Sequence, residues 1–334
     1  MPTTRIHAPT PRALRLLATA LRRGELVAIP TETVYGLAAH ALDARACRKI
    51  FTAKRRPADD PLIVHVPDLK AAEQLAEFND AARALVGHFW PGPLTIVLPK
   101  KKIVPAIVTS GQDSVALRSP AHPLARKLLK LAGIPLAAPS ANPFGYVSPT
   151  TAEHVVDGLG GRIKHVLDGG PCAVGVESTI VDARDSKNLR ILRPGSISVR
   201  ELTAVLRRAG LKGRVSLVRR KPAVLAPGLL DQHYSPHTPL SLVARIPTPA
   251  RRGAGEKTAL IYWKKPAGTV SENSFSLSTR GAPEEAAKKL YAALRQIDAG
   301  GFDRIVAESA PASAGALGIA INDRLARAAG KRAH

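Results

Sequence analysis

Apolar and polar positions along this chain follow two patterns in turn, which together predict an α/β protein. Short apolar runs bounded by Gly, Pro or charged residues are typical of strands buried in a sheet. Between these runs, apolar residues recur at helical spacing, which predicts amphipathic helices. Strands are expected at residues 26–29, 62–66, 94–98, 114–118, 134–138, 163–167, 178–182 and 189–193. Helices are expected at residues 11–23, 43–54, 68–78, 80–89, 122–131, 151–158 and 198–208.

The pattern breaks between residues 213 and 239, where the chain is basic, carries several prolines and has no period. We expect a linker at 213–239, which separates a first domain at 10–212 from a small α/β domain at 240–334. In the small domain, strands are expected at 259–263, 275–277 and 304–307, and helices at 283–297 and 314–329.

The strand expected at 62–66 places its side chains alternately on two faces. Leu62, Val64 and Val66 share one face, and Ile63 and His65 share the other. A lone histidine in an apolar strand is commonly a satisfied core residue. His65 nevertheless follows a cluster of basic residues closely, so both can face the same cavity.

That basic cluster, Lys54, Arg55 and Arg56, lies at the end of an expected helix, and prolines bracket the loop after it. Positive charge there is favourable against the helix dipole, which would explain an ordinary surface cluster. Guanidinium groups and lysine also bind phosphate oxygens. Because the prolines would hold the cluster rigid, a phosphate-binding role is the functional interpretation.

Polar groups also follow several expected strands. The turn PTETVYG at 30–36 and the loop at 139–150 each follow an apolar run, and Arg118 and Arg193 end two further strands. Ligand sites in α/β sheets commonly lie beyond strand ends. We therefore expect these segments to meet around one polar cavity.

Composition narrows the class of protein. A chain of 334 residues is long enough for two domains, and an apolar fraction of 45% can fill their cores. The formal charge of +23, from 49 Lys and Arg against 26 Asp and Glu, indicates either a solvated basic surface or a polyanionic partner. The basic first 24 residues could pass for a transit peptide, but their helical spacing favours a first domain helix.

Several classes of site have no signal in the sequence. Cys47 and Cys172 are isolated, which excludes a disulfide scaffold and favours a reducing cytoplasm. No apolar run approaches the ~20 residues that cross a bilayer, so we expect no membrane partner. Neither a Walker loop nor GxGxxG occurs, and no His, Cys and Asp residues have metal-ligand spacing.

Five segments together resemble the YrdC-like domain. They read TETVYGL at 31–37, KRRPADDPLIVH at 54–65, SAN at 140–142, ESTIVD at 177–182 and RPG at 193–195. The linker sequence HYSP at 233–236 and the segment 315–329 resemble the two-domain form of this family, the threonylcarbamoyl-AMP synthases. The resemblance covers nearly the whole chain. It implies a YrdC-like twisted mixed sheet with helices around a basic cavity, plus a smaller Rossmann-like C-terminal domain.

The resemblance also implies a reaction. Members of this family join L-threonine, bicarbonate or CO₂ and ATP into threonylcarbamoyl-AMP and release pyrophosphate. The product feeds a modification of the adenosine next to the anticodon of tRNA. The implied activity is that of a nucleotidyltransferase, with Mg²⁺ accompanying ATP and with tRNA or a tRNA-modifying transferase complex as the downstream partner.

Roles for individual residues follow from the same resemblance. Threonine would be bound by Thr33, His65, Arg118 and Ser178. ATP would be bound by Arg56, Asp60, Ser114, Ser140, Ser148, Arg193 and Tyr234. The residues expected to act in catalysis are Lys54, Arg56 and Arg193, and the linker would fold Tyr234 over the nucleotide. No side chain is expected to bind the metal, which would enter with ATP.

Three positions depart from the family pattern. Asp60 stands where the family often has asparagine, and a carboxylate there would repel phosphate unless it holds a metal or turns away. The linker reads APGLL at 226–230 in place of the commoner Ser-Pro-Gly-Met. Ala138 offers no side-chain hydroxyl, so any contact there must come from the backbone.

Two other functions remain open from the sequence. The first is a double-stranded-RNA or ribosome-binding module without catalysis, which the net charge permits. The intact Lys54, Arg56, His65 and Arg193 argue against it. The second is carbamoyl transfer in hydrogenase maturation, which uses a related domain but carries zinc-finger cysteines that this chain lacks.

Overall fold

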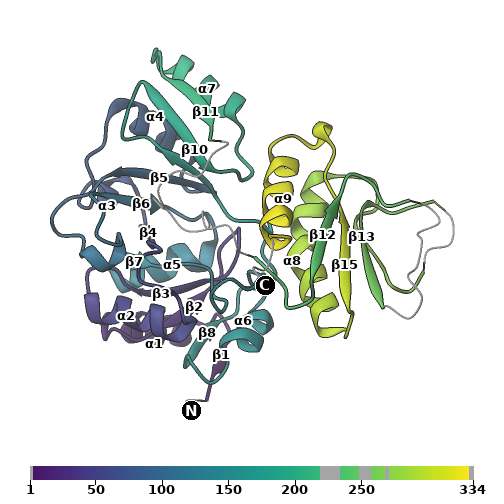
Figure 1. Cartoon of the computed structure of the whole chain (residues 1–334). Helices are drawn as coiled ribbons and strands as arrows, with labels where there is room; N and C mark the ends of the chain where they lie inside the picture. Colours follow the sequence, from purple (N-terminus) through teal and green to yellow (C-terminus); the bar gives the residue numbers. More distant parts are fainter. Residues whose placement is uncertain (1–2, 219–233, 248–256, 268–270, 331–334) are drawn as a thin grey trace.

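The computed structural model of the chain describes residues 3–218, 234–247, 257–267 and 271–330. The described elements form two α/β units that lie side by side, each built on its own sheet (Figure 1). The larger unit contains the expected first domain. Most of the expected linker lies outside the described residues.

The larger unit is built on a mixed sheet with the strand order β1-β8-β2-β3-β7-β4-β6-β5-β9-β10-β11. Its strands are β1 (Arg5–His7), β2 (Val27–Ile29), β3 (Gly36–His40), β4 (Ile63–His65), β5 (Leu94–Pro99), β6 (Ser114–Arg118), β7 (Leu136–Ala137), β8 (His165–Leu167), β9 (Thr179–Asp182), β10 (Asn188–Arg193) and β11 (Arg214–Leu217). Parallel pairs such as β4 with β6 alternate with antiparallel pairs such as β5 with β6. The expected twisted mixed sheet is confirmed.

Helices cover both faces of this sheet. They are α1 (Pro11–Arg22), α2 (Ala44–Lys54), α3 (Leu69–Ala72), α4 (Asp80–Phe89), α5 (Pro123–Ala132), α6 (Ala152–Leu159) and α7 (Val199–Arg208). Helices α1 and α5 pack on the face that receives Val27 and Ile29 of β2. Ala28, between them, points to the opposite face, which α2, α4, α6 and α7 cover. Successive side chains of this one strand therefore pack into two separate hydrophobic cores.

Local sequence sets several helix boundaries. Asp43 caps α2, and its carboxylate accepts a hydrogen bond from the backbone N–H of Arg45. Ser198 and Glu201 form a capping box at the start of α7. Gly133 ends α5 in the left-handed conformation with φ of 65°. These boundaries agree with the sequence-based prediction to within a residue or two.

One expected helix was wrong in length. The sequence predicted a helix over 68–78, but α3 ends at Ala72. The following residues leave the helix to bond near the end of β5, where the Glu77 N–H donates to the Pro99 carbonyl. The Lys101 N–H similarly donates to the Leu75 carbonyl. These sheet-edge bonds replace the last helical turn.

The smaller unit contains a parallel sheet with the strand order β12-β15-β13-β14. Its elements are β12 (Leu240–Val243), β13 (Thr258–Lys264), β14 (Ser274–Ser278), α8 (Pro283–Ala299), β15 (Arg304–Glu308) and α9 (Gly315–Ala328). Figure 1 shows α8 and α9 between this sheet and the larger unit. The all-parallel order, with α8 connecting β14 to β15, confirms the expected Rossmann-like α/β domain.

One apolar cluster joins the two units. Val34, Val147 and Val176 of the larger unit belong to the same buried cluster as Leu290 and Ile321 of the smaller unit. Gly175 permits this close approach, because a Cβ atom there would lie 2.4 Å from the Ala287 carbonyl oxygen of α8. The two units therefore share one hydrophobic cluster at their contact.

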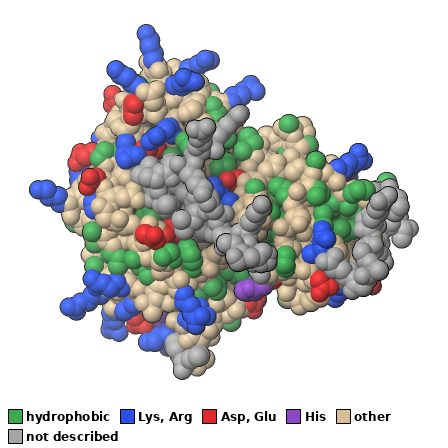
Figure 2. Space-filling view, in the orientation of Figure 1, with side chains coloured by type: hydrophobic (Ala, Val, Ile, Leu, Met, Phe, Trp, Pro, Cys, Tyr) green, Lys and Arg blue, Asp and Glu red, His purple; other side chains and the backbone are tan. Residues whose placement is uncertain are grey.

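Exposed positive charge gathers at the edges of the larger unit. Figure 2 shows Lys and Arg side chains projecting over α7 with β11 and over α1 with α2. Among the described residues, no helix has the length and apolar character needed to cross a membrane.

Candidate active site

A small pocket of about 30 Å³ lies where several strand ends meet. His65 ends β4 and Arg118 ends β6, and the parallel pairing of these strands sets the two residues side by side. Thr33 enters from the turn after β2, Ser140 from the loop after β7, and Arg193 from the end of β10. The expected convergence of polar strand ends is present in the structure.

One end of the pocket carries an arginine held by two neighbours. The Arg118 guanidinium donates to the Thr33 hydroxyl at 2.9 Å and pairs with the Glu32 carboxylate at 2.7 Å. Thr33 also lies 2.9 Å from the Thr31 hydroxyl. Arg118 and Thr33 are both buried. This end therefore offers a fixed cation beside hydroxyl groups, which suits a carboxylate with a neighbouring hydroxyl or amine.

His65 faces the same end and is neutral. Burial, and after it the nearby Arg118 charge, lowers its pKa to about 3. Its Nδ1 is buried and has no hydrogen-bond partner among the described residues. A neutral imidazole with an unpaired nitrogen can bind a polar ligand group without adding charge.

The pocket lining also includes Arg56, which is buried in a tight pair with Asp60. The guanidinium lies 2.9 Å from the Asp60 carboxylate and donates to the Asp60 and Pro61 carbonyl oxygens. Burial raises the pKa of Asp60, while Arg56 and Lys54 oppose that shift. Asp60 does not line the pocket. The carboxylate that departs from the family pattern thus faces an arginine instead of an incoming phosphate.

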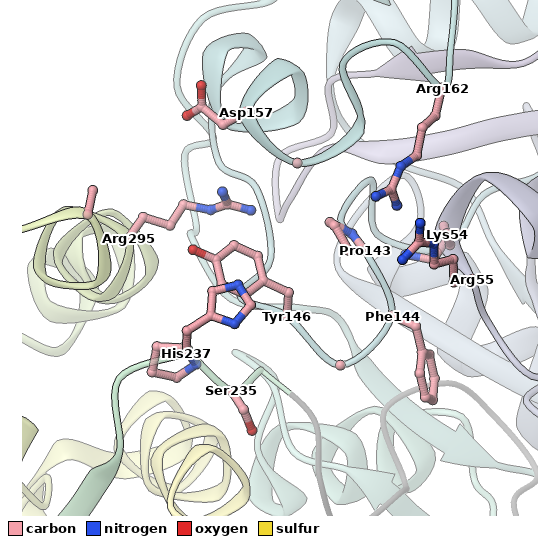
Figure 3. A pocket seen from close by; sticks show the side chains of 14 residues that line it. Lys54, Arg55, Pro143, Phe144, Tyr146, Asp157, Arg162, Ser235, His237 and Arg295 are labelled. Carbon is pink, nitrogen blue, oxygen red and sulfur yellow. The ribbon is translucent and has the colours of Figure 1, made fainter. Parts of the chain in front are cut away.

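Lys54 is buried behind the wall of the pocket. Its ammonium group donates to the carbonyl oxygens of Ser140 and Asn142, which fixes the loop after β7. Burial lowers its pKa well below the usual lysine value, and Arg56 adds to the effect. Lys54 also lines a neighbouring cavity of about 790 Å³ between the two units. Figure 3 shows Arg55 and Arg162 on one side of that cavity and Arg295 on the other.

Arg193 is fixed through Ser178. Its guanidinium donates to the Ser178 carbonyl at 3.2 Å and to the Ser178 hydroxyl at 3.1 Å. The Ser178 hydroxyl in turn lies 2.7 Å from the Thr95 hydroxyl on β5. Burial lowers the pKa of Arg193 somewhat, and the guanidinium remains a cation. Ser178 therefore positions Arg193 in this structure.

Tyr234, at the end of the expected linker, closes the pocket. It is buried, lines the pocket and has a left-handed backbone with φ of 65°. Its ring stacks on Tyr291 of α8 with a centroid distance of 5.9 Å. That Tyr234 covers a bound nucleotide stays a prediction, and linker residues 219–233 lie outside the described part of the chain.

The residues predicted from the sequence fall into three groups. Those that line the pocket are Thr33, Arg56, His65, Arg118, Ser140, Arg193 and Tyr234. Those that lie behind it and contact a lining residue are Lys54, Asp60, Ser148 and Ser178. Ser114 lies away from the pocket, and its buried hydroxyl has no partner in the described part of the chain.

Sequence reasoning assigned no role to Glu177 at the pocket, or to Tyr291 and Arg324, which contact it. Glu177 lines the pocket and accepts hydrogen bonds from Ser148, Tyr291 and Arg324. Arg324 stands on the buried face of α9, between Ile321 and Leu325. A charged residue at an apolar helical position is the signal that could have revealed a buried partner.

No group of three or more His, Cys, Asp or Glu residues with the arrangement of a metal site occurs in the described ranges. The carboxylates of Glu32, Asp60 and Glu177 are each paired with an arginine. Their charge is thus already compensated by the protein.

Fold and site together define an α/β enzyme domain of the YrdC type with a second α/β domain packed against it. The Sua5/YciO/YrdC family model, described as telomere recombination, matches residues 19–195. The model for the C-terminal domain of threonylcarbamoyl-AMP synthase matches residues 197–330. The chain belongs to the family of two-domain threonylcarbamoyl-AMP synthases, which confirms the family suggested by its motifs.

Curated relatives match over nearly the full length. The threonylcarbamoyl-AMP synthase of Pyrococcus abyssi is 40% identical, over 96% of this chain and 94% of the relative. The Bacillus subtilis protein of that name is 41% identical, over 94% of this chain and 92% of the relative.

Solved structures agree with this assignment. The crystal structure of Pyrococcus abyssi Sua5 complexed with L-threonine has a TM-score of 0.86 and 38% identity, and the match covers 98% of each chain. Escherichia coli YciO matches 60% of this chain and all of its own, with a TM-score of 0.54 and 21% identity, and supports the fold alone.

Proposed function

We propose that this protein is an L-threonylcarbamoyladenylate synthase, a nucleotidyltransferase that condenses L-threonine, bicarbonate or CO₂ and ATP. The observation that carries the proposal is one pocket lined by two groups of polar residues. One group combines Arg118, Thr33 and neutral His65, and the other contains Arg56 and Arg193. The synthase names of the full-length relatives give the reaction class.

The first group fits threonine. The Arg118 guanidinium would bind the amino-acid carboxylate, because a buried arginine makes strong charge-assisted bonds to carboxylates. Thr33 and His65 offer hydrogen-bonding groups for the hydroxyl and the amine. The crystal structure of the Pyrococcus abyssi relative with L-threonine supports an amino-acid site in this fold.

The second group fits the phosphates of ATP. Arg56 and Arg193 are buried cations that both line the pocket, and Ser140 adds a hydroxyl at its wall. Lys54 would act by holding the Ser140 loop, since its ammonium already contacts two carbonyl oxygens. Three of the residues assigned from the resemblance would act indirectly, by holding a residue that lines the pocket. Asp60 holds Arg56, Ser148 holds Glu177, and Ser178 holds Arg193.

The chemistry needs alignment and charge stabilisation more than a protein nucleophile. The threonine amine and bicarbonate form a carbamate and water. A carbamate oxygen then attacks the α-phosphorus, the bond to the bridging oxygen breaks, and pyrophosphate leaves with that electron pair. Fixed arginines stabilise the negative charge that develops, and the closed pocket excludes water from the reactive adenylate.

Mg²⁺ would enter as part of the nucleotide substrate. The carboxylates at the pocket are already paired with arginines, so the phosphate oxygens are the ligands best placed to hold the ion. Its contribution would be to neutralise phosphate charge. The downstream partner, tRNA or a tRNA-modifying transferase complex, and a cytoplasmic location remain predictions from the family resemblance.

The alternative function, RNA binding without catalysis, is less well supported. A nucleic-acid backbone needs exposed cations. The pocket arginines Arg56, Arg118 and Arg193 are only 6%, 4% and 4% exposed. Exposed arginines on α1 and α7 leave contact with RNA open as an additional property, but they do not explain the pocket.

The test is pyrophosphate release by the purified full chain. We expect release only when threonine, bicarbonate and MgATP are all present, because the carbamate must form before the α-phosphorus is attacked. Serine or alanine in place of threonine gives the specificity control. Pyrophosphate release that is unchanged without threonine, or absent in every mixture, would overturn the proposal.

A further inference from the structure

The two domains meet at a buried carboxylate. Glu177 lies in the segment before β9, lines the candidate active site and is 5% exposed. Burying an ionised carboxylate is costly unless cations and hydrogen-bond donors compensate it. The groups that compensate Glu177 therefore matter for the neighbouring site.

Two of the three donors to Glu177 come from the C-terminal domain. The Tyr291 hydroxyl on α8 donates at 2.8 Å, and the Arg324 Nε on α9 donates at 3.0 Å. The third donor is the Ser148 hydroxyl, at 2.6 Å. Burial would raise the pKa of Glu177, but Arg324 and then Arg193 outweigh it and lower the pKa to about 2. Glu177 is thus a full negative charge at neutral pH.

Arg324 makes other contacts near the site besides its ion pair with Glu177. It is fully buried, and its NH1 donates to the Pro194 carbonyl at 2.6 Å, directly after Arg193 in the chain. Its guanidinium also lies 5.4 Å from the ring centroid of Tyr234. One C-terminal arginine therefore contacts the carboxylate, the backbone beside the nucleotide arginine and the tyrosine that closes the pocket.

The charge balance explains why this arrangement matters. Among the described residues, Glu177 forms its ion pair with Arg324, which also pairs with Asp323 at 3.0 Å. In a buried region the Coulomb attraction between unlike charges is strong. Without Arg324, the uncompensated Glu177 charge would weaken the attraction of the neighbouring Arg193 for a triphosphate.

We propose that Arg324 is a positioning residue for the nucleotide part of the site: it compensates the charge of Glu177, which would otherwise weaken the attraction of the neighbouring Arg193 for the anionic substrate. The C-terminal domain then completes the active site instead of merely flanking it. This inference rests on the proposed function, because it takes the substrate at Arg193 to be ATP.

The test compares steady-state kinetics of pyrophosphate release in full-length variants. Arg324→Met keeps the length of the side chain but removes its charge, and we expect the KM for ATP to rise about tenfold. The KM for threonine should change far less, because Arg118 has its own counterion in Glu32. Lys289→Met is the control, since Lys289 is in the same domain and forms an exposed ion pair with Glu285.

The double variant separates charge compensation from a merely structural role. With Glu177→Gln there is no carboxylate to neutralise, so adding Arg324→Met should leave the KM for ATP within about threefold of Glu177→Gln alone. This comparison still decides the matter if Arg324→Met alone does not fold. A tenfold rise in the KM for ATP in both backgrounds, or a single variant that behaves like Lys289→Met, would overturn the inference. Absence of pyrophosphate release by the unmodified protein would instead refute the proposed function.

Discussion

Arg56 and Asp60 show how one residue pair joins stability to substrate binding. Both side chains are buried, and their charged atoms lie 2.9 Å apart. Removing one partner of a buried ion pair leaves the other charge uncompensated, which typically costs about 3–5 kcal/mol. A loss of function in an Arg56 variant therefore has two sources, loss of the phosphate-binding cation and loss of fold stability.

A double variant separates these two sources. We expect Arg56→Ala to lower the free energy of unfolding by about 3–5 kcal/mol and to weaken ATP binding. Arg56→Ala with Asp60→Asn should recover most of the stability but not the ATP affinity. Denaturant unfolding and calorimetric titration with ATP give the two quantities. Arg55→Ala, at the exposed neighbouring position, is the control. A double variant that binds ATP as tightly as the unmodified chain would show that Arg56 does not bind phosphate.

His65 predicts a specific dependence of stability on pH. Its folded pKa of about 3 lies below the usual histidine value of about 6.5, so the unfolded chain takes up a proton more readily than the native state. The contribution of His65 is complete above about pH 6.5 and is lost as the pH falls toward 3, at about 1.4 kcal/mol per pH unit. His65→Gln should reduce the slope between pH 6.5 and 4.5 by about that amount. The control is His88→Gln, an exposed histidine, and an unchanged slope in His65→Gln would contradict the assignment.

For single residues, the sequence predicted most of those that line the pocket but not the partner that each one contacts. The alternation in 62–66 correctly placed His65 opposite Val64, because strand periodicity is local. The partner of Asp60 could not be predicted, since several cations lie nearby in sequence. The Glu177–Arg324 pair joins residues 147 positions apart, and no local pattern encodes such a contact.

Helix α8 and the segment around Gly175 set the contact between the domains. Gly175 has φ of 85°, and a Cβ there would lie 2.4 Å from the Ala287 carbonyl oxygen and 2.5 Å from the Lys288 Cα. These are backbone atoms within a helix, so they cannot yield as a flexible side chain can. Substitution would have to push α8 away from the segment that leads to Glu177.

Gly175→Ala should therefore destabilise the protein more than backbone strain alone explains. Gly111→Ala is the matched control, because Gly111 has φ of 79° but open space around its Cα. We expect each variant to lose about 1 kcal/mol from the left-handed backbone, and Gly175→Ala to lose an additional 1–3 kcal/mol or so from the clash. Urea unfolding measures both losses. Equal losses in the two variants would show that the domains do not pack closely at Gly175.

Elements with strong patterns were predicted well, and those with weak patterns were missed. Strand β3 escaped prediction because its Gly and Ala residues lack the β-branched signal of a strand. Strand β11 lies within the expected linker and gains its place by pairing with β10. Strands β1 and β12 are likewise short and are defined by their partners. Whether such segments form strands depends on their pairing with other strands in the folded protein.

At the scale of the whole molecule, the two domains share both an apolar cluster and the polar site. Val34, Val147 and Val176 pack into the same cluster as the helices of the C-terminal domain, and Tyr234 stacks on Tyr291 beside the pocket. The sequence indicated two domains and a closing linker. It could not show that α9 supplies a charge to the active site, because that depends on how the domains are docked.

The central claim is that this pocket joins threonine, an inorganic carbon source and ATP into one adenylate. The most direct measurement is mass spectrometry of the products formed by the purified full-length protein with L-threonine, MgATP and ¹³C-labelled bicarbonate. The account predicts threonylcarbamoyl-AMP that carries the label, formed together with pyrophosphate and lost when Arg193 is replaced by Ala. An unlabelled adenylate, or no adenylate beside intact ATP, would contradict it.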